Sequence, residues 1–312
     1  MKKVLMTITD FTQEENNQLH DIAGLDVIFK DKADITKEDI KNADAVVGNI
    51  EPSLLKDENL EWFQSESAGV NQYLNVLDRK CLLTCATGSY GIAISEYMIA
   101  MMLNIMKRIP AYFKDQENQR WVNEGRVISP IGKRILVVGT GDIGKQFAKR
   151  AKDLGGHIVG MRRREGDIEG FDEMYTIDAL KREVELADVI AISLPASKHT
   201  YHLFNKEILS SCKKDAILMN VGRGNVLDTS ILKDVAKQFL GIWLDVLEEE
   251  PLPANSPLWH IDNLYITPHI TGGYQLDITL KNLYKIVRHN MIAYASNTEM
   301  VSRVDRKWGY AQ

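Results

Sequence analysis

The 312-residue sequence has few cysteines, no long apolar run and no block of basic residues. Its three cysteines, Cys81, Cys85 and Cys212, are an odd number without metal-ligand spacing. That pattern excludes a disulfide framework, predicts no bound metal and favours reduced thiols in a cytoplasmic protein. Because no segment approaches the ~20 apolar residues of a membrane-spanning helix, we expect no association with membranes.

The charge balance excludes a further class of partner. Lys and Arg number 38 against 43 Asp and Glu, a formal net charge of −5, which disfavours binding to a nucleic acid. With 45% hydrophobic and 26% charged residues, the composition is that of an ordinary globular protein. The length suits two domains of roughly 150 residues each. The first apolar run is short and ends at Asp10, so it predicts a β-strand rather than a signal peptide.

Short apolar runs alternate with helix-compatible segments, which is typical of βαβ units around a parallel sheet. Helices are predicted at Thr12–His20 and Lys37–Lys41, and the first series of strands at Val4–Thr7, Val27–Phe29, Ala45–Val47, Trp62–Gln64 and Leu82–Thr84. A second series of strands is predicted at Ile135–Val138, Ile158–Gly160, Val189–Ser193, Ile217–Asn220, Gly241–Leu244 and Tyr265–Thr267. Six strands alternating with helices make a complete dinucleotide-binding domain.

The segment Ile94–Ile109, between the two series, is apolar on more than one face and predicts a helix buried on several sides. Two interpretations stay open: a central core helix, or a helix buried between domains or subunits. A loop is predicted at Arg120–Pro130 and a late helix at Leu276–Ala295.

A glycine-rich turn gives the first chemical signal. Gly139, Gly141 and Gly144 form a G-x-G-x-x-G pattern between a predicted strand and the predicted helix Lys145–Leu154. In that context the pattern predicts a site for a dinucleotide pyrophosphate at the helix N-terminus. Asp142 and Ile143 lie in the same turn, and the Asp142 carboxylate is awkward beside an anion unless it points to solvent.

The tip of the next strand carries Arg162, Arg163 and Arg164. An NAD site usually has an acidic residue about 20 residues after the turn, whereas arginines there suit the 2′-phosphate of NADP. The three arginines favour NADP as the cofactor. Glu165, an acidic residue directly after them, leaves NAD as the other candidate cofactor. The alternative interpretation is a solvated basic surface that binds no ligand.

Three polar side chains follow strands of the second series and so belong to the carboxyl edge of one sheet, where ligands bind. Arg223 could bind a carboxylate and polarise a carbonyl, and His269 could transfer a proton. Glu250 could fix the tautomer of His269 and favour its protonated form. A structural role for each side chain is the alternative.

At these positions the sequence resembles the D-isomer-specific 2-hydroxyacid dehydrogenases, over nearly the whole chain. The matching motifs are Ser67–Val70, Ile94–Tyr97, Asp188–Asn205, Asn220–Asp228, Gly241–Pro253 and Thr267–Ile270. The resemblance implies two Rossmann-like, doubly wound parallel-sheet domains with a cleft between them, and usually a dimer. Residues 1–97 with 286–312 would form a flavodoxin-like substrate-binding domain, and residues 98–285 the dinucleotide-binding domain.

The resemblance also assigns roles to residues. Arg223, Glu250 and His269 would be catalytic, with Glu250 chosen from three consecutive acids because it precedes Pro251. The substrate carboxylate would bind Arg223 and the backbone of Ala68, Gly69 and Val70. The residues expected to bind the cofactor are Gly139, Gly141, Asp142, Ile143, Gly144, Arg162, Arg163, Pro195, Thr200, Val221, Gly222 and Asp245.

The implied activity is hydride transfer between NAD(P)H and a small 2-keto or D-2-hydroxy acid resembling glyoxylate, hydroxypyruvate or pyruvate. The alternative is a dinucleotide-sensing interaction protein of the same fold without significant turnover.

Overall fold

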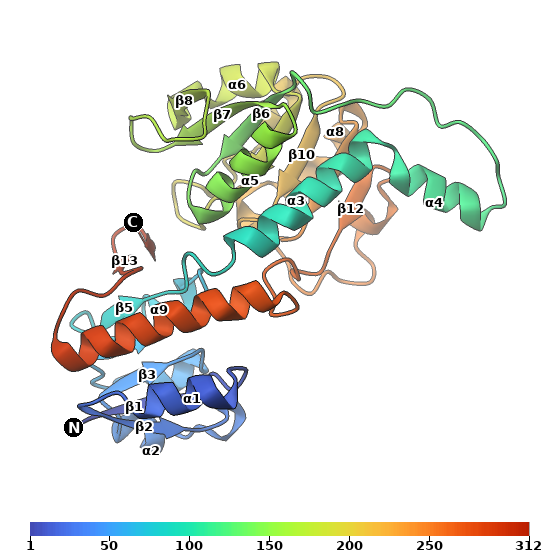
Figure 1. Cartoon of the computed structure of the whole chain (residues 1–312). Helices are drawn as coiled ribbons and strands as arrows, with labels where there is room; N and C mark the ends of the chain where they lie inside the picture. The colour runs from blue at the N-terminus through green and yellow to red at the C-terminus, as the bar shows by residue number, and fades with distance from the viewer. Residues whose placement is uncertain (312) are drawn as a thin grey trace. The chain divides into compact units, whose positions relative to one another are not determined.

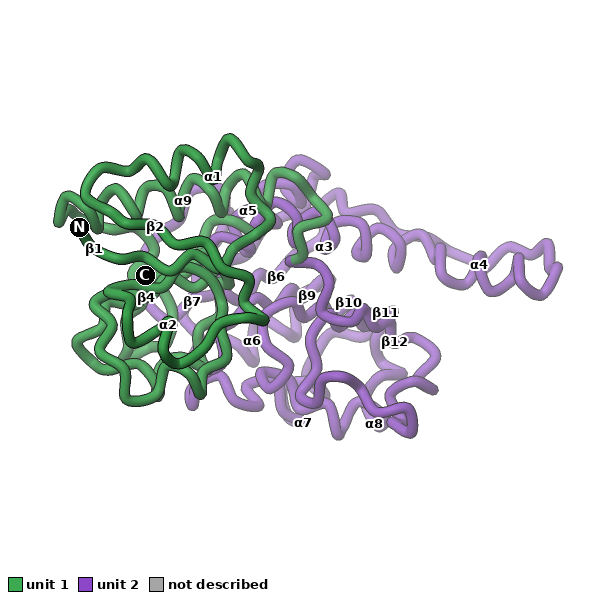
Figure 2. Tube along the Cα trace, turned by 90° about the horizontal axis from the view of Figure 1, so that it is seen from below, with its two compact units in different colours: residues 1–90, 273–312 green, residues 91–272 purple. Residues whose placement is uncertain are grey.

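The computed structural model describes residues 1–311 of the chain, which divides into two compact units. Unit 1 comprises residues 1–90 and 273–312, and unit 2 comprises residues 91–272 (Figure 2). The chain therefore passes between units at 90/91 and 272/273, whereas the sequence placed these passages at 97/98 and 285/286. Each unit is built around its own parallel sheet (Figure 1).

Unit 1 contains a five-stranded parallel sheet of order β2-β1-β3-β4-β5, which is the strand order of flavodoxin-like sheets. The strands are β1 (Lys2–Met6), β2 (Leu25–Phe29), β3 (Ala45–Val47), β4 (Trp62–Gln64) and β5 (Leu82–Thr84). The helices are α1 (Gln13–His20), α2 (Lys37–Lys41) and α9 (Asp277–Ser296), and a short antiparallel pair, β13 (Val304–Asp305) and β14 (Tyr310–Ala311), follows them. A capping box starts α1: Thr12 accepts from the Glu15 N–H, and Glu15 accepts from the Thr12 N–H.

Unit 2 contains a seven-stranded parallel sheet of order β12-β11-β10-β9-β6-β7-β8. The strands are β6 (Arg134–Val138), β7 (His157–Arg162), β8 (Glu173–Thr176), β9 (Val189–Ile192), β10 (Ile217–Asn220), β11 (Gly241–Leu244) and β12 (Leu264–Ile266). The helices are α3 (Gly91–Met106), α4 (Ile109–Glu117), α5 (Asp142–Asp153), α6 (Leu180–Leu186), α7 (Lys206–Ser211) and α8 (Leu232–Val235). The sheet reverses its order at β6 and β9, which is the switch point where dinucleotides bind in doubly wound folds.

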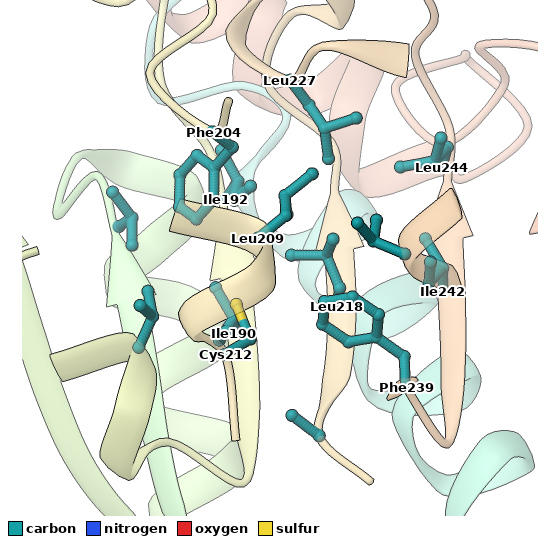
Figure 3. Close-up of a cluster of buried hydrophobic side chains, with 14 of the residues drawn as sticks. Ile190, Ile192, Phe204, Leu209, Cys212, Leu218, Leu227, Phe239, Ile242 and Leu244 are labelled. Atoms are coloured by element: carbon teal, nitrogen blue, oxygen red, sulfur yellow. The ribbon is translucent and has the colours of Figure 1, made fainter. Parts of the chain in front are cut away.

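Helices cover both faces of the unit 2 sheet. Successive side chains of a strand point to opposite faces, so β6 packs against helices on both sides. Leu136 and Val138 of β6 pack with Leu180 and Val184 of α6 in a fully apolar cluster, part of which Figure 3 shows. On the opposite face, α5 lies close enough to β6 that a methyl group at Gly144 would contact the Val137 side chain.

The structure corrects several predicted boundaries. β8 was not predicted, so the sheet has seven strands rather than six. The predicted helix Ile94–Ile109 begins earlier, at Gly91, and ends at Met106, because Arg108 adopts a left-handed conformation (φ 55°) ahead of α4. One face of α3 is buried, while Tyr97 on another face is 39% exposed.

All three cysteines are buried and unpaired, as the sequence predicts. Burial raises the pKa of the Cys81 and Cys212 thiols to about 12. Among the helices described for residues 1–311, none combines the length and the apolar character that crossing a membrane requires.

Candidate active site

The glycine-rich turn links β6 to α5 and has the shape that a pyrophosphate requires. At Gly144 a side chain is impossible, because its Cβ would lie 2.0 Å from the Gly139 carbonyl oxygen. At Gly141, by contrast, a Cβ would have no described atom within 4 Å. Gly141 is also the N-cap of α5, and no side chain of the described residues caps this helix. The turn therefore leaves both space and helix N–H groups for a phosphate, so its residues fit a bound dinucleotide.

The carboxylate of Asp142 has a protein partner. Its Oδ2 accepts a hydrogen bond of 2.9 Å from the N–H of Gly91, the first residue of α3. A helix N-terminus is a favourable place for a negative charge, so α3 compensates the carboxylate. From the sequence, the Asp142 carboxylate was expected either to point to solvent or to lie near the pyrophosphate. The structure differs, because this carboxylate contacts the start of α3.

Other residues expected at the cofactor lie on loops that leave the same sheet edge. Arg162 ends β7 and is half-buried, whereas Arg163 and Arg164 are exposed. After β9, the Thr200 hydroxyl donates to the Pro195 carbonyl (2.7 Å) and closes a short loop.

The three residues expected to be catalytic follow β10, β11 and β12, at the carboxyl ends of adjacent strands. The Nδ1 atom of His269 lies 2.8 Å from the Glu250 Oε2 atom, and Glu250 Oε1 accepts from the Leu247 N–H (2.8 Å). The Nε2 atom of His269 has no hydrogen-bond partner among residues 1–311. Both side chains are partly exposed, at 49% for His269 and 37% for Glu250.

Arg223 is half-buried and donates from Nη1 to the Gly222 carbonyl (2.8 Å). Burial lowers the pKa of its guanidinium, and the nearby negative charge of Glu250 partly opposes that effect. The guanidinium bonds otherwise to no described residue, so its remaining N–H groups are available to an anionic ligand.

Two buried polar residues shape these loops, and the sequence did not assign them that task. Asp245 is only 2% exposed and accepts from the Thr267 hydroxyl (2.5 Å) and the Thr271 hydroxyl (2.6 Å). It therefore anchors the loop that carries His269, and its expected role in binding the cofactor stays a prediction. Asn220 accepts from the Gly222 N–H (3.0 Å) and donates to the Arg223 carbonyl (3.1 Å). Asn220 ends the apolar strand β10 and Asp245 directly follows the apolar strand β11. A polar residue at the end of an apolar run is the sequence pattern that could have predicted this role.

A second histidine–glutamate pair lies nearby. His202 Nε2 is 2.6 Å from Glu248 Oε1, and the other Glu248 oxygen accepts from the Thr229 hydroxyl (3.0 Å). Of the three consecutive acids, Glu248 thus pairs with His202 and Glu250 with His269. The choice of Glu250 as the partner of His269 agrees with this geometry.

The backbone expected to bind the substrate carboxylate lies in unit 1, in the loop that follows β4. The N–H groups of Ala68, Gly69 and Val70 donate to no acceptor within the described chain. Consecutive unpaired N–H groups form a site suited to an anion. Their availability is consistent with the expected role.

Comparisons with known proteins place this architecture in a family. Residues 99–271 match the family model described as the NAD-binding domain of D-isomer specific 2-hydroxyacid dehydrogenases. A glyoxylate reductase from Thermofilum pendens is 31% identical over 72% of this chain and 70% of its own.

A solved structure points the same way. The D-isomer specific 2-hydroxyacid dehydrogenase family protein from Aeromonas salmonicida is 31% identical, with a TM-score of 0.84 over 98% of this chain and 99% of its own. The chain is therefore a member of the D-isomer specific 2-hydroxyacid dehydrogenase family, and its NAD(P)-binding domain is unit 2.

Proposed function

We propose that the protein reduces a small 2-keto acid to the D-2-hydroxy acid with NAD(P)H, reversibly, with Arg223, Glu250 and His269 as its catalytic residues. The observation that carries the proposal is the His269–Glu250 pair. Nδ1 of His269 is hydrogen-bonded to Glu250, whereas Nε2 has no partner among the described residues. Curated relatives named glyoxylate reductase and glyoxylate/hydroxypyruvate reductase support substrates of that size.

Each residue has a chemical task in this reaction. The bound nicotinamide cofactor supplies the hydride that reaches the carbonyl carbon. His269 donates the proton to the carbonyl oxygen through Nε2, while Glu250 holds Nδ1–H and stabilises the imidazolium. Arg223 binds the carboxylate and polarises the carbonyl, and the N–H groups of Ala68–Val70 bind the carboxylate as well.

We assign NADP as the preferred cofactor, with NAD as the weaker one. The support is Arg162 at the end of β7 with Arg163 beside it, since guanidinium groups bind a 2′-phosphate bidentately. Pro195, Thr200, Val221 and Gly222 belong to the loops at the same sheet edge, and we assign them to the cofactor site with the glycine-rich turn.

A homodimer in the cytoplasm completes the proposal. The helix α4 and the loop after it extend away from the rest of unit 2 (Figures 1 and 2). They carry exposed apolar side chains, among them Phe113 (62%), Trp121 (103%) and Val122 (43%). Apolar side chains gathered on one projection favour contact with a second copy. The buried, unpaired cysteines support a reducing compartment.

The decisive experiment is a steady-state assay with glyoxylate, hydroxypyruvate, pyruvate and branched 2-keto acids, each with NADPH and with NADH. Turnover of at least one acid, with a higher kcat/KM for NADPH, is expected. Tight cofactor binding without turnover of any acid would instead favour the dinucleotide sensor. The double variant Arg162→Ala/Arg163→Ala should weaken NADPH far more than NADH, and equal losses would contradict the NADP assignment.

The dimer has its own measurement. Light scattering coupled to size-exclusion chromatography should give twice the mass of one chain for the wild type, and Phe113→Asp/Trp121→Asp should shift the protein towards the monomer. A wild type that elutes as a monomer would remove the dimer from the proposal.

A further inference from the structure

The loop of residues 65–70, here the carboxylate loop, is held by side chains that lie far from it in sequence. Asn49, just after β3, makes three of these bonds. Its Oδ1 accepts from the Ser65 hydroxyl (2.9 Å) and the Glu66 N–H (3.2 Å), and its Nδ2 donates to the Ser67 hydroxyl (2.6 Å). A single amide therefore binds three consecutive residues of the loop.

Tyr90 holds the same loop from another direction. It is the last residue of unit 1 before the chain enters unit 2, it is 8% exposed, and its hydroxyl donates to the Glu66 carbonyl. Tyr274 hydrogen-bonds to this phenol, and burial raises the pKa of Tyr90 to about 12. The Tyr90 hydroxyl thus stays protonated and able to donate throughout the neutral range.

Together these contacts use the polar groups of the first half of the loop. The Ser67 N–H bonds to the Ser65 hydroxyl (3.0 Å), and the Ser67 carbonyl accepts from the Ala86 N–H (3.1 Å). Past Ser67 the pattern changes, because the N–H groups of Ala68, Gly69 and Val70 bond to no described residue. Residues 65–67, which are fixed by hydrogen bonds, therefore directly precede residues 68–70, whose N–H groups have no described acceptor.

We propose that Asn49 and Tyr90 are positioning residues, which fix residues 65–67 so that the N–H groups of Ala68–Val70 are pre-arranged to bind the substrate carboxylate. This inference rests on the proposed function, because it takes the carboxylate loop as the binding site for the 2-keto acid. Pre-arranged donors bind an anion more tightly because less freedom is lost on binding. Neither side chain needs to contact the substrate.

The test compares Asn49→Ala and Tyr90→Phe with the matched control Tyr284→Phe. The control removes a hydroxyl from the same unit, one that donates to Gln18 (2.6 Å) and is remote in sequence from the loop. For both test variants we expect KM for the 2-keto acid to rise about tenfold, with a smaller change in kcat. The Kd for NADPH should stay that of the wild type, because the cofactor turn belongs to unit 2. Ser67→Ala, which removes one Asn49 contact, is the substitute variant in case Asn49→Ala does not fold. It should raise KM for the 2-keto acid by less than tenfold.

A second readout does not depend on activity. Hydrogen–deuterium exchange at the amides of residues 66–70 should accelerate in Asn49→Ala and Tyr90→Phe and match the wild type in Tyr284→Phe. If the wild type reduces no 2-keto acid, the proposed function fails while the exchange measurement still judges the positioning. Exchange rates and KM values equal to those of Tyr284→Phe would overturn the inference.

Discussion

Unit 2 carries histidine–glutamate pairs at both edges of its sheet, and one pair from each edge, His157–Glu173 and His269–Glu250, shows how different their surroundings are. At the amino edge, His157 Nε2 lies 2.6 Å from Glu173 Oε1, and at the carboxyl edge His269 Nδ1 lies 2.8 Å from Glu250 Oε2. Glu173 also accepts from Arg134 (2.6 and 2.9 Å) and from the Tyr175 hydroxyl (2.7 Å). Within residues 1–311, Glu250 accepts only one further hydrogen bond, from the Leu247 N–H.

The two pairs differ in how many of their polar atoms are already bonded. The amino-edge pair is saturated, because Arg134 continues to the almost fully buried Glu183 (2.6 Å) and closes an ionic network. The carboxyl-edge pair leaves one imidazole nitrogen without a described partner, beside a half-buried arginine. A proton can enter and leave the second pair without breaking a network. On the proposed function we therefore expect proton transfer at Nε2 of His269 and none at the His157–Glu173 pair.

The largest expected difference is in turnover. His269→Gln should lower kcat by about 10²- to 10⁴-fold, the usual contribution of a general acid, and leave NADPH binding nearly intact. His157→Gln, the same change at the opposite edge, should leave kcat within about twofold of the wild type, since surface changes away from a site have small effects. Steady-state kinetics on both variants measures this, and equal losses would erase the distinction between the two edges.

The next largest difference is in stability. Arg134→Ala should lower the free energy of unfolding by about 1.5–3 kcal/mol, because the buried Glu183 loses its bonds to Arg134 and keeps only Arg182 (2.7 Å) as a cation. Arg150→Ala is the control: its partner Glu96 is 52% exposed at 3.6 Å, so the loss should stay below about 1 kcal/mol. Urea unfolding of the three proteins makes the comparison. Similar losses for both variants would mean that the amino-edge network is no stronger than a surface pair.

The smallest effect concerns acid. Hydrogen bonds from Arg134 hold the pKa of Glu173 well below its usual range. The resulting stabilisation is complete above the unfolded-state pKa of about 4.3, and it is lost as the pH falls below that value, where the unfolded chain binds the proton first. The free energy of unfolding should therefore decline less steeply between about pH 4.3 and 2.5 in Glu173→Gln than in the wild type. Parallel declines in urea unfolding curves would remove Glu173 from the acid response.

Sequence patterns predict those parts of the molecule that repeat or that follow a strand. The buried strands and the residues at their carboxyl ends stand out because apolar runs end there in charged or glycine-rich turns. The edge strand β8 escapes prediction, since Glu173–Thr176 is half-exposed and begins with a charged residue, so it lacks an apolar run.

Contacts between distant segments account for the rest. Nothing near Asn49 or Tyr90 in the sequence indicates that both bond to residues 65–67, because only the folded sheet brings β3, β4 and the end of unit 1 together. The surroundings of Asp142 depend in the same way on α3, which begins 51 residues earlier in the chain.

That last contact has a consequence for protein engineering. Neutralising Asp142 is an obvious step for anyone who wants to raise the affinity of the glycine-rich turn for phosphates. The same carboxylate, however, fastens Gly91, where the chain enters unit 2, and lies 2.5 Å from where a Cβ on that glycine would be. A substitution that neutralises Asp142 therefore also removes its hydrogen bond to Gly91, so the charge of the turn cannot be changed at this residue without loss of that contact.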